Sequence, residues 1–394
     1  MKNILYILLF ISSVGYSQTP ITNTNYSPTN DACEQIQSTY IPTKPFNDSI
    51  LFIKVKNGIL NSMNIQNNMD SGMVSVYFAW TWSYYATAAV NGYKITKETK
   101  YLELVSNSYK HILSFIDSKK GYKDYYLEKS LPSWGHKRNN QPHWWNEVTM
   151  PGRITTPACL FLLELKKDSS LMDLYKEEYD LFLSETEGAI NAALNFYDEN
   201  EGSFYCNNSK KPEALNHSHS LGVSFVLMYQ LTGNLKYKII VKQMLDYFKS
   251  NIQLRDGMLT WPYVPSEEKN IKPELARKAA VTLQFPFYAN KAELFISDEE
   301  MQQFVDVFKF SVYQDCKFQS STDPNQSISK YKLINADIIS FMYLSEFDSS
   351  VYPILDNEIA QNTTGLFNKK WFSDRMSILA YSYKGLLEKK SKHE

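Results

Sequence analysis

The sequence predicts an all-α protein, an (α/α)6-type toroid in which an outer ring of helices wraps an inner ring. Three observations lead to this prediction. Long stretches with helical periodicity dominate, and alternating strand patterns are rare. About twelve such stretches alternate between less polar and more amphipathic. Finally, an apolar helix, a short polar turn and a tyrosine that opens a second helix recur along the chain. Repetition on this scale is typical of stacked helical hairpins.

The repeat is clearest in two segments. Residues 86–116 read ATAAVNGYKITKETKYLELVSNSYKHILSFI, and residues 224–252 read SFVLMYQLTGNLKYKIIVKQMLDYFKSNI. Tyr101 and Tyr237 occupy the same place in the two segments, after the polar turn. Each segment therefore predicts an inner helix followed by an outer one.

Twelve helices follow from this pattern. The inner, less polar helices are expected at residues 72–92, 151–166, 218–232, 275–293, 334–346 and 371–389. The outer, amphipathic helices are expected at residues 46–63, 97–118, 171–196, 235–252, 298–314 and 350–361. The connections between hairpins are long, at residues 119–150, 197–217, 253–274 and 315–333. Long loops in compact domains are commonly functional, and in this topology they meet at the N-terminal ends of the inner helices.

The N-terminus predicts export. Residues 1–17 contain a lysine, an apolar run too short to span a bilayer and then small residues, which is the pattern of a secretory signal peptide. Residues 18–45 are expected to form an extended lead-in, and residues 46–394 a single toroid domain. We expect a periplasmic or secreted monomer.

Composition narrows the range of partners. The net charge is −1 and 21% of residues are charged, so no broad basic field is available for nucleic acid. No later segment resembles a transmembrane helix, so no membrane partner is expected. The four cysteines lack the spacing of a zinc site, and we expect neither a metal nor another cofactor. The aromatic share of 14% is also found in exported carbohydrate binders.

Polar and aromatic side chains gather at the expected mouths of the inner helices. In chain order they are Asp70, Tyr77, Trp80 and Trp82; His143, Trp144, Trp145, Asn146, Glu147 and Arg153; Asn216, His217 and His219; Trp261, Tyr263, Glu274, Arg277 and Lys278, with Tyr288 further along the same helix; Lys330, Tyr331 and Asn335; and Lys370 and Trp371. Indoles stack on sugar rings, and arginine and lysine pair with carboxylates. The set predicts an anionic polysaccharide or oligosaccharide as ligand. The alternative is that the tryptophans only fill the toroid.

Two histidines, His217 and His219, stand one residue apart at an expected helix start. Ser218 or Ser220 is available as the helix cap, which would leave both imidazoles to the cleft. A helix N-terminus disfavours imidazolium, so a neutral base is expected there. The spacing of the pair does not suit a metal on one helical face.

Three segments carry a resemblance to a known family. They are LNHSHSLGVSFVLMYQLTGNLKYKIIVKQMLDYF at 215–248, DGMLTWPYVP at 256–265 and PELARKAAVTLQFPFYA at 273–289. Together they resemble exported α/α-toroid polysaccharide lyases that act on uronic-acid chains, of the alginate and glucuronan lyase type. The likeness covers roughly residues 144–295.

The resemblance implies positions for several residues. It places Asn216 and His217 in the cleft, Trp261 and Tyr263 on the next loop, and Glu274 at the start of the following helix. The sequence departs from the family pattern where E-D-x-S-H is expected, since this chain has E-L-A-R-K at residues 274–278. Other residues could carry the chemistry, the specificity could differ, or the activity could be lost.

The leading expectation is metal-independent β-elimination from a uronate. Asn216 and Arg277 would offset the carboxylate, His217 would act as base and Tyr263 as acid, with Tyr288 in reserve. Trp80, Trp144, Trp145, Asn146, Glu147, Arg153, His219, Trp261, Glu274 and Lys278 would bind the substrate.

Other function classes remain open. A glycoside hydrolase on the same toroid would use Glu147 and Glu274, or Asp70 with either of them. A uronyl epimerase would share the proton-abstraction machinery. A non-catalytic glycan-binding protein would keep the tryptophans without needing His217 and Tyr263.

Overall fold

A computed structural model describes residues 45–64, 71–137, 142–206, 211–265, 272–314, 317–324, 339–357 and 373–392. The expected signal peptide and almost all of the lead-in lie outside these ranges. So do Asp70, Lys330, Tyr331, Asn335, Lys370 and Trp371. None of the described helices is both long and apolar enough to cross a membrane.

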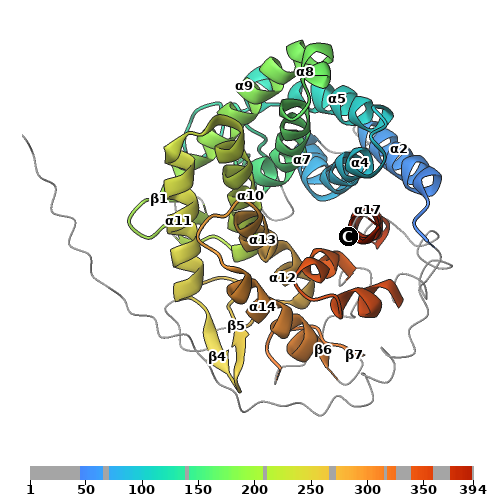
Figure 1. The fold of residues 1–394 in the computed structure, drawn as a ribbon. Helices are drawn as coiled ribbons and strands as arrows, with labels where there is room; N and C mark the ends of the chain where they lie inside the picture. Colours follow the sequence, from blue (N-terminus) through green and yellow to red (C-terminus); the bar gives the residue numbers. More distant parts are fainter. Residues whose placement is uncertain are drawn as a thin grey trace, which may run out of the picture.

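The described helices form an α/α toroid (Figure 1). The inner elements are a composite first helix (η2 Ser71–Met73, α3 Val74–Tyr77, η3 Phe78–Trp82 and α4 Ser83–Thr96), α7 (Thr149–Lys166), α10 (Leu215–Thr232), α12 (Ala276–Thr282) with α13 (Gln284–Lys291), η7 (Ile339–Glu346) and α17 (Ser373–Ser391). Neighbours in this series pack on one another, and α17 closes the ring by packing on α4.

The outer elements alternate with the inner ones along the chain. They are α2 (Asp48–Asn64), α5 (Lys100–Leu113), α8 (Ser169–Leu174) with α9 (Lys176–Ala193), α11 (Leu235–Ser250), α14 (Asp298–Val307) with η6 (Phe308–Val312), and a short helix at residues 351–357. The expected alternation of inner and outer helices is confirmed. Two expected helices are interrupted, one at Tyr175 and the other at Leu283.

The repeat seen in the sequence is a repeat of hydrogen bonds. Thr96 and Thr232 each donate a side-chain bond back to the preceding turn of an inner helix and accept one from a backbone N–H two residues on. The following tyrosines, Tyr101 and Tyr237, each donate to a carboxylate on a neighbouring outer helix, Asp48 and Glu187 respectively. The recurring tyrosine therefore joins its hairpin to the preceding outer helix through a hydrogen bond.

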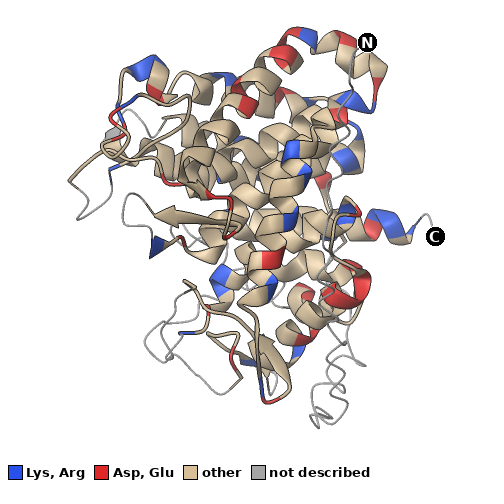
Figure 2. Ribbon diagram, turned by 90° about the vertical axis from the view of Figure 1, so that its left-hand side faces the viewer, with Lys and Arg blue, Asp and Glu red and all other residues tan. Residues whose placement is uncertain are grey.

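Short strands and a one-turn helix, α6 (Asp117–Lys120), occupy the long loops. β1 (Tyr197–Asp198), β2 (Ser203–Cys206) and β3 (Lys211–Pro212) form one antiparallel sheet; β4 (Gln253–Arg255) pairs with β5 (Met258–Thr260), and β6 (Tyr313–Gln314) with β7 (Lys317–Phe318). The β4–β5 turn has positive φ at Asp256 and Gly257, at 48° and 79°, as tight two-residue hairpins require. Most of the ribbon in the middle of the molecule is uncharged, and charged positions gather at helix ends and loops (Figure 2).

Helices α7 and α10 approach so closely that their backbones touch. A Cβ added to Gly152 would lie 2.4 Å from the backbone nitrogen of Leu221. Ser224 uses the same gap, donating to the Gly152 carbonyl at 3.0 Å and accepting from Thr155 at 2.8 Å. The two helices are therefore held in one fixed register at their N-terminal halves.

We expect Gly152→Ala to lower the free energy of unfolding by about 1–3 kcal/mol, because a rigid backbone meets the new methyl group. Gly188→Ala on α9 is the matched control, since its nearest outside atom would be a Pro132 carbon at 3.9 Å. Urea denaturation of both variants measures the difference. Equal stability of the two would show that α7 and α10 can separate without cost.

Candidate active site

The candidate site lies where the first turn of α10 meets three long loops. Leu215 at the start of α10 donates its backbone N–H to the Tyr263 carbonyl at 3.0 Å, which fixes the loop after β5. On the other side, His136 and Trp145 pair through two backbone hydrogen bonds, and Lys137 donates to the Gly72 carbonyl at 2.9 Å. These contacts bring side chains that are far apart in sequence to the mouth of α10.

His217 is gripped by two carboxylates. Its Nδ1 lies 3.0 Å from an oxygen of Glu147 and 3.0 Å from an oxygen of Glu213. Burial alone would lower the pKa of the imidazole, but the two carboxylates outweigh burial and raise the pKa to about 9. A pKa raised in this way favours the imidazolium form at neutral pH. This direction is opposite to the neutral base expected from the sequence, because two full negative charges exceed the partial charge of the helix end.

Each carboxylate is itself held in place. Glu147 accepts from Thr149 at 2.7 Å and contacts His136 Nε2 at 2.8 Å, and Glu213 accepts from the backbone N–H of Ala214 at 2.9 Å. Sequence reasoning missed His136 and Glu213. Glu213 carried a usable signal, since it stands four residues before His217. No group of three potential metal ligands in the described part of the chain is arranged to hold an ion.

The open side of His217 faces aromatic rings. Its ring centroid lies 6.4 Å from that of Tyr263, edge-on, and 6.4 Å from that of half-buried Trp80. Lys278 Nζ lies 3.3 Å from the Tyr263 centroid. In the described residues His217 Nε2 makes no hydrogen bond, and the side chain keeps 14% exposure. A histidine nitrogen, a phenol and a cation thus share one edge of the mouth.

Two further sequence candidates belong to this surface. Asn216 is buried beside His217 in the first turn of α10, and its Oδ1 accepts no hydrogen bond from the part of the chain that the structure describes. Arg153, one turn into α7, places its guanidinium carbon 5.7 Å from the Trp80 ring centroid. Tyr288 lies deeper, with its hydroxyl 3.5 Å from that of Tyr383.

Several other candidates are structural. Trp261 donates to buried Glu274 at 2.5 Å, and Thr282 donates to the same carboxyl at 2.8 Å. Burial raises the pKa of Glu274 to about 7. His219 is wedged between Phe248 and Phe285, and burial lowers its pKa to about 4. The expectation that Trp261, Glu274 and His219 contact substrate does not agree with this packing.

Most of the candidate side chains in the loop before α7 also pack against other parts of the protein. Trp144 and Asn146 donate to Asp117 at 2.9 and 3.1 Å, and Trp145 is buried beside His136. These side chains hold the loop that presents Glu147, and the expected direct contact of Trp145 and Asn146 with substrate stays a prediction. Trp144 is half-buried and stacks on Tyr122.

Arg277, expected to offset the substrate carboxylate, is exposed on the first turn of α12, and its role stays a prediction. Neither Ser218 nor Ser220 caps α10, since both donate back to carbonyls one turn earlier and Ala214 is the N-cap residue.

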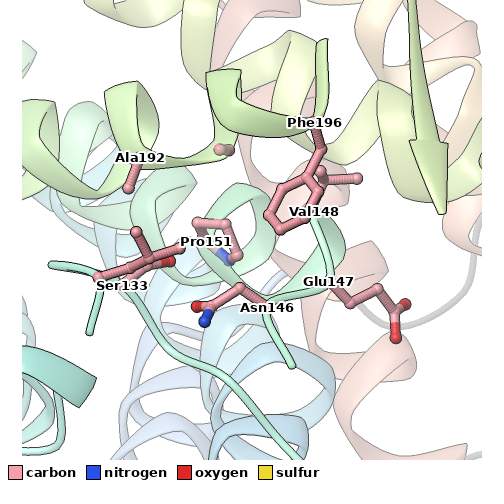
Figure 3. Close-up of a pocket in the computed structure, with 9 residues that line it drawn as sticks. Ser133, Asn146, Glu147, Val148, Pro151, Ala192 and Phe196 are labelled. Atoms are coloured by element: carbon pink, nitrogen blue, oxygen red, sulfur yellow. The ribbon is translucent and has the colours of Figure 1, made fainter. Parts of the chain in front are cut away.

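A small crevice lies behind the site (Figure 3). Ser133, Asn146, Val148 and Phe196 are among the residues that line it, and the Glu147 carboxylate points away from the others. It has essentially no volume that a water-sized molecule could occupy, whereas small-molecule pockets have roughly 300–1,000 Å³. The crevice is therefore too small for a sugar.

Comparisons with known proteins give the fold. No family model matches the sequence, and no curated protein matches it. The structure is similar to a GH76 α-mannanase from Bacteroides thetaiotaomicron, with a TM-score of 0.53 and 12% identity over 88% of this chain and 100% of that one. It is also similar to an inactive variant of an α-1,6-mannanase from Salegentibacter sp. HEL1_6 in complex with α-1,6-mannotetrose, with a TM-score of 0.51 and 10% identity over 86% and 99%.

A polysaccharide lyase gives a TM-score of 0.47 at 13% identity, over 86% of this chain and 98% of that one. At these identities the matches above a TM-score of 0.5 show the shared α/α-toroid fold.

We expect Glu147→Gln to lower the pKa of His217 from about 9, because the substitution removes one of the two charges that stabilise the imidazolium. Nuclear magnetic resonance titration of the imidazole measures this directly. Glu185→Gln is the control, since Glu185 pairs with Lys119 on the outer surface. An unchanged His217 pKa in Glu147→Gln would show that Glu213 alone sets it.

Proposed function

We propose that this protein is a polysaccharide lyase that cleaves a uronic-acid-containing glycan by metal-independent β-elimination. The observation that carries the proposal is the approach of His217 to Tyr263, with ring centroids 6.4 Å apart and Lys278 against the phenol. Elimination needs a base for the C5 proton, an acid for the leaving oxygen and a partner for the carboxylate. All three kinds of group stand at this mouth.

The charge state of His217 assigns the roles. As an imidazolium, it is suited to protonate the glycosidic oxygen when the C4–O bond breaks. Tyr263 is then the group that takes the C5 proton as the C4–C5 double bond forms, and the positive charge of Lys278 beside its ring suits that role. The proposal keeps for Asn216 the role expected from the sequence, donation of its amide to the uronate carboxylate. These roles of His217 and Tyr263 are the reverse of those expected from the sequence.

A glycoside hydrolase fits the site less well. It needs two carboxyl groups that face each other across the scissile bond. Glu274 is enclosed by Trp261 and Thr282, and Glu147 faces His217 and His136. The inactive α-1,6-mannanase variant has two adjacent aspartates replaced, whereas this sequence contains no two consecutive aspartates.

The setting of the enzyme is part of the proposal. The pattern of residues 1–17 supports export to the periplasm or the medium, where extracellular glycans are met. The cationic groups at the mouth, Arg153 and Lys278, favour an anionic chain as substrate. We propose that the protein acts as a monomer, since the mouth is built within one chain.

We expect His217→Ala and Tyr263→Phe each to reduce turnover by about a hundredfold or more, as loss of an acid–base group does. The assay follows the ultraviolet absorbance of the unsaturated product. His111→Ala on α5 and Tyr179→Phe on α9 are matched controls on the outer ring and should keep wild-type turnover. Full activity in both site variants would remove the basis of the assignment.

A further inference from the structure

Arg153 is a buried cation for which the described residues supply no counter-ion. Its side chain projects from α7 and is only 5% exposed. Among these residues it donates a hydrogen bond to the neutral amide oxygen of Gln284, at 3.0 Å, and its Nε finds no partner. Within the described residues it forms no ion pair. Buried charges are ordinarily paired, because removal from water is costly without an opposite charge.

The surroundings of Arg153 add positive charge and aromatic faces. Its guanidinium carbon lies 4.3 Å from the centroid of Tyr84, and that of Arg375 lies 5.4 Å from the same ring. Arg375 donates to Thr81 at 2.6 Å. Aromatic faces offset part of the cost of burying a guanidinium but cannot neutralise it. An anion that enters this site would meet the positive charge of Arg153.

The location of Arg153 connects it to the reaction. Trp80 has the Arg153 guanidinium 5.7 Å from its centroid and the His217 ring 6.4 Å from it. Trp80 lies within a wide helical turn at Phe78–Trp82, and its indole is half-buried. A sugar stacked on this indole would present its substituents to Arg153 and to His217 together.

We infer that Arg153 binds an acidic substituent of the glycan and makes a charged sugar a requirement for productive binding. The inference rests on the proposed function, since it takes the ligand to be a glycan that reaches His217. The substituent we assign is a uronate carboxylate, whose two oxygens match the fork of a guanidinium. A sulfate ester offers similar oxygens and is distinguished by experiment.

The first test measures binding without turnover. In a Tyr263→Phe background, isothermal titration compares a glucuronate tetrasaccharide, its carboxyl-reduced neutral counterpart and a sulfated neutral tetrasaccharide. We expect Arg153→Met to weaken binding of the glucuronate ligand by roughly 10- to 100-fold, the range for a lost charge-assisted hydrogen bond, and to leave the neutral ligand unaffected. Arg153→Lys should fall between, because it keeps the charge and loses the fork.

The second test separates recognition from a structural role. If Arg153 exists to bind an anion, Arg153→Met removes an uncompensated charge, and its melting temperature without ligand should equal or exceed that of the wild type. If Arg153 instead serves packing through Tyr84 and Gln284, the melting temperature should fall. Lys242→Met on α11, which removes an exposed cation paired with Asp246, is the control for both tests.

The outcomes are distinguishable from failure of the lyase proposal. Unchanged preference for the acidic ligand in Arg153→Met, or a lowered melting temperature with unchanged binding, would overturn the assignment of Arg153 alone. If the sulfated ligand binds more strongly than the glucuronate ligand, the substituent assigned to Arg153 is a sulfate ester and not a carboxylate. Loss of acidic binding in Arg153→Met would support the subsite even if the wild type released no unsaturated product.

Discussion

The close contact between α7 and α10 is the constraint on which the site depends. Because Gly152 lets the two backbones touch, the start of α7 and the first turn of α10 lie side by side. Glu147, just before α7, therefore reaches His217, two residues into α10. Glu147 could not raise the pKa of His217 in this way if the helices were separated by an ordinary side-chain layer. The packing of the inner ring therefore determines which charged groups lie beside His217.

The two sides of the mouth carry different charged groups. On one side two glutamates hold a protonated His217, and on the other Arg153 lies against Tyr84 without an acidic partner among the described residues. Trp80 lies between them. A neutral sugar would bring no negative charge to pair with Arg153. An acidic sugar stacked on Trp80 would pair with Arg153 while its glycosidic bond faces His217, so recognition and reaction would require the same substrate.

The sequence predicts the ring of helices because helical period and the recurring turn before Tyr101 and Tyr237 are local signals. It also predicts that Asn216, His217 and Tyr263 stand near one mouth. It does not predict the charge of His217, since that depends on Glu147, which is distant in the chain. Nor does it predict that His219 and Trp261 turn inward, because closeness to a helix start does not fix the side on which a residue lies. The long-range packing of the loops decides both.

The most direct measurement of the central claim is the incubation of purified mature protein, with chelator present, against glucuronan, alginate and related uronic-acid polymers. The readout is the ultraviolet absorbance of a C4–C5 unsaturated uronate. We expect a rise in absorbance with at least one of these polymers. New reducing ends without that absorbance would show hydrolysis and contradict the proposed elimination at His217 and Tyr263.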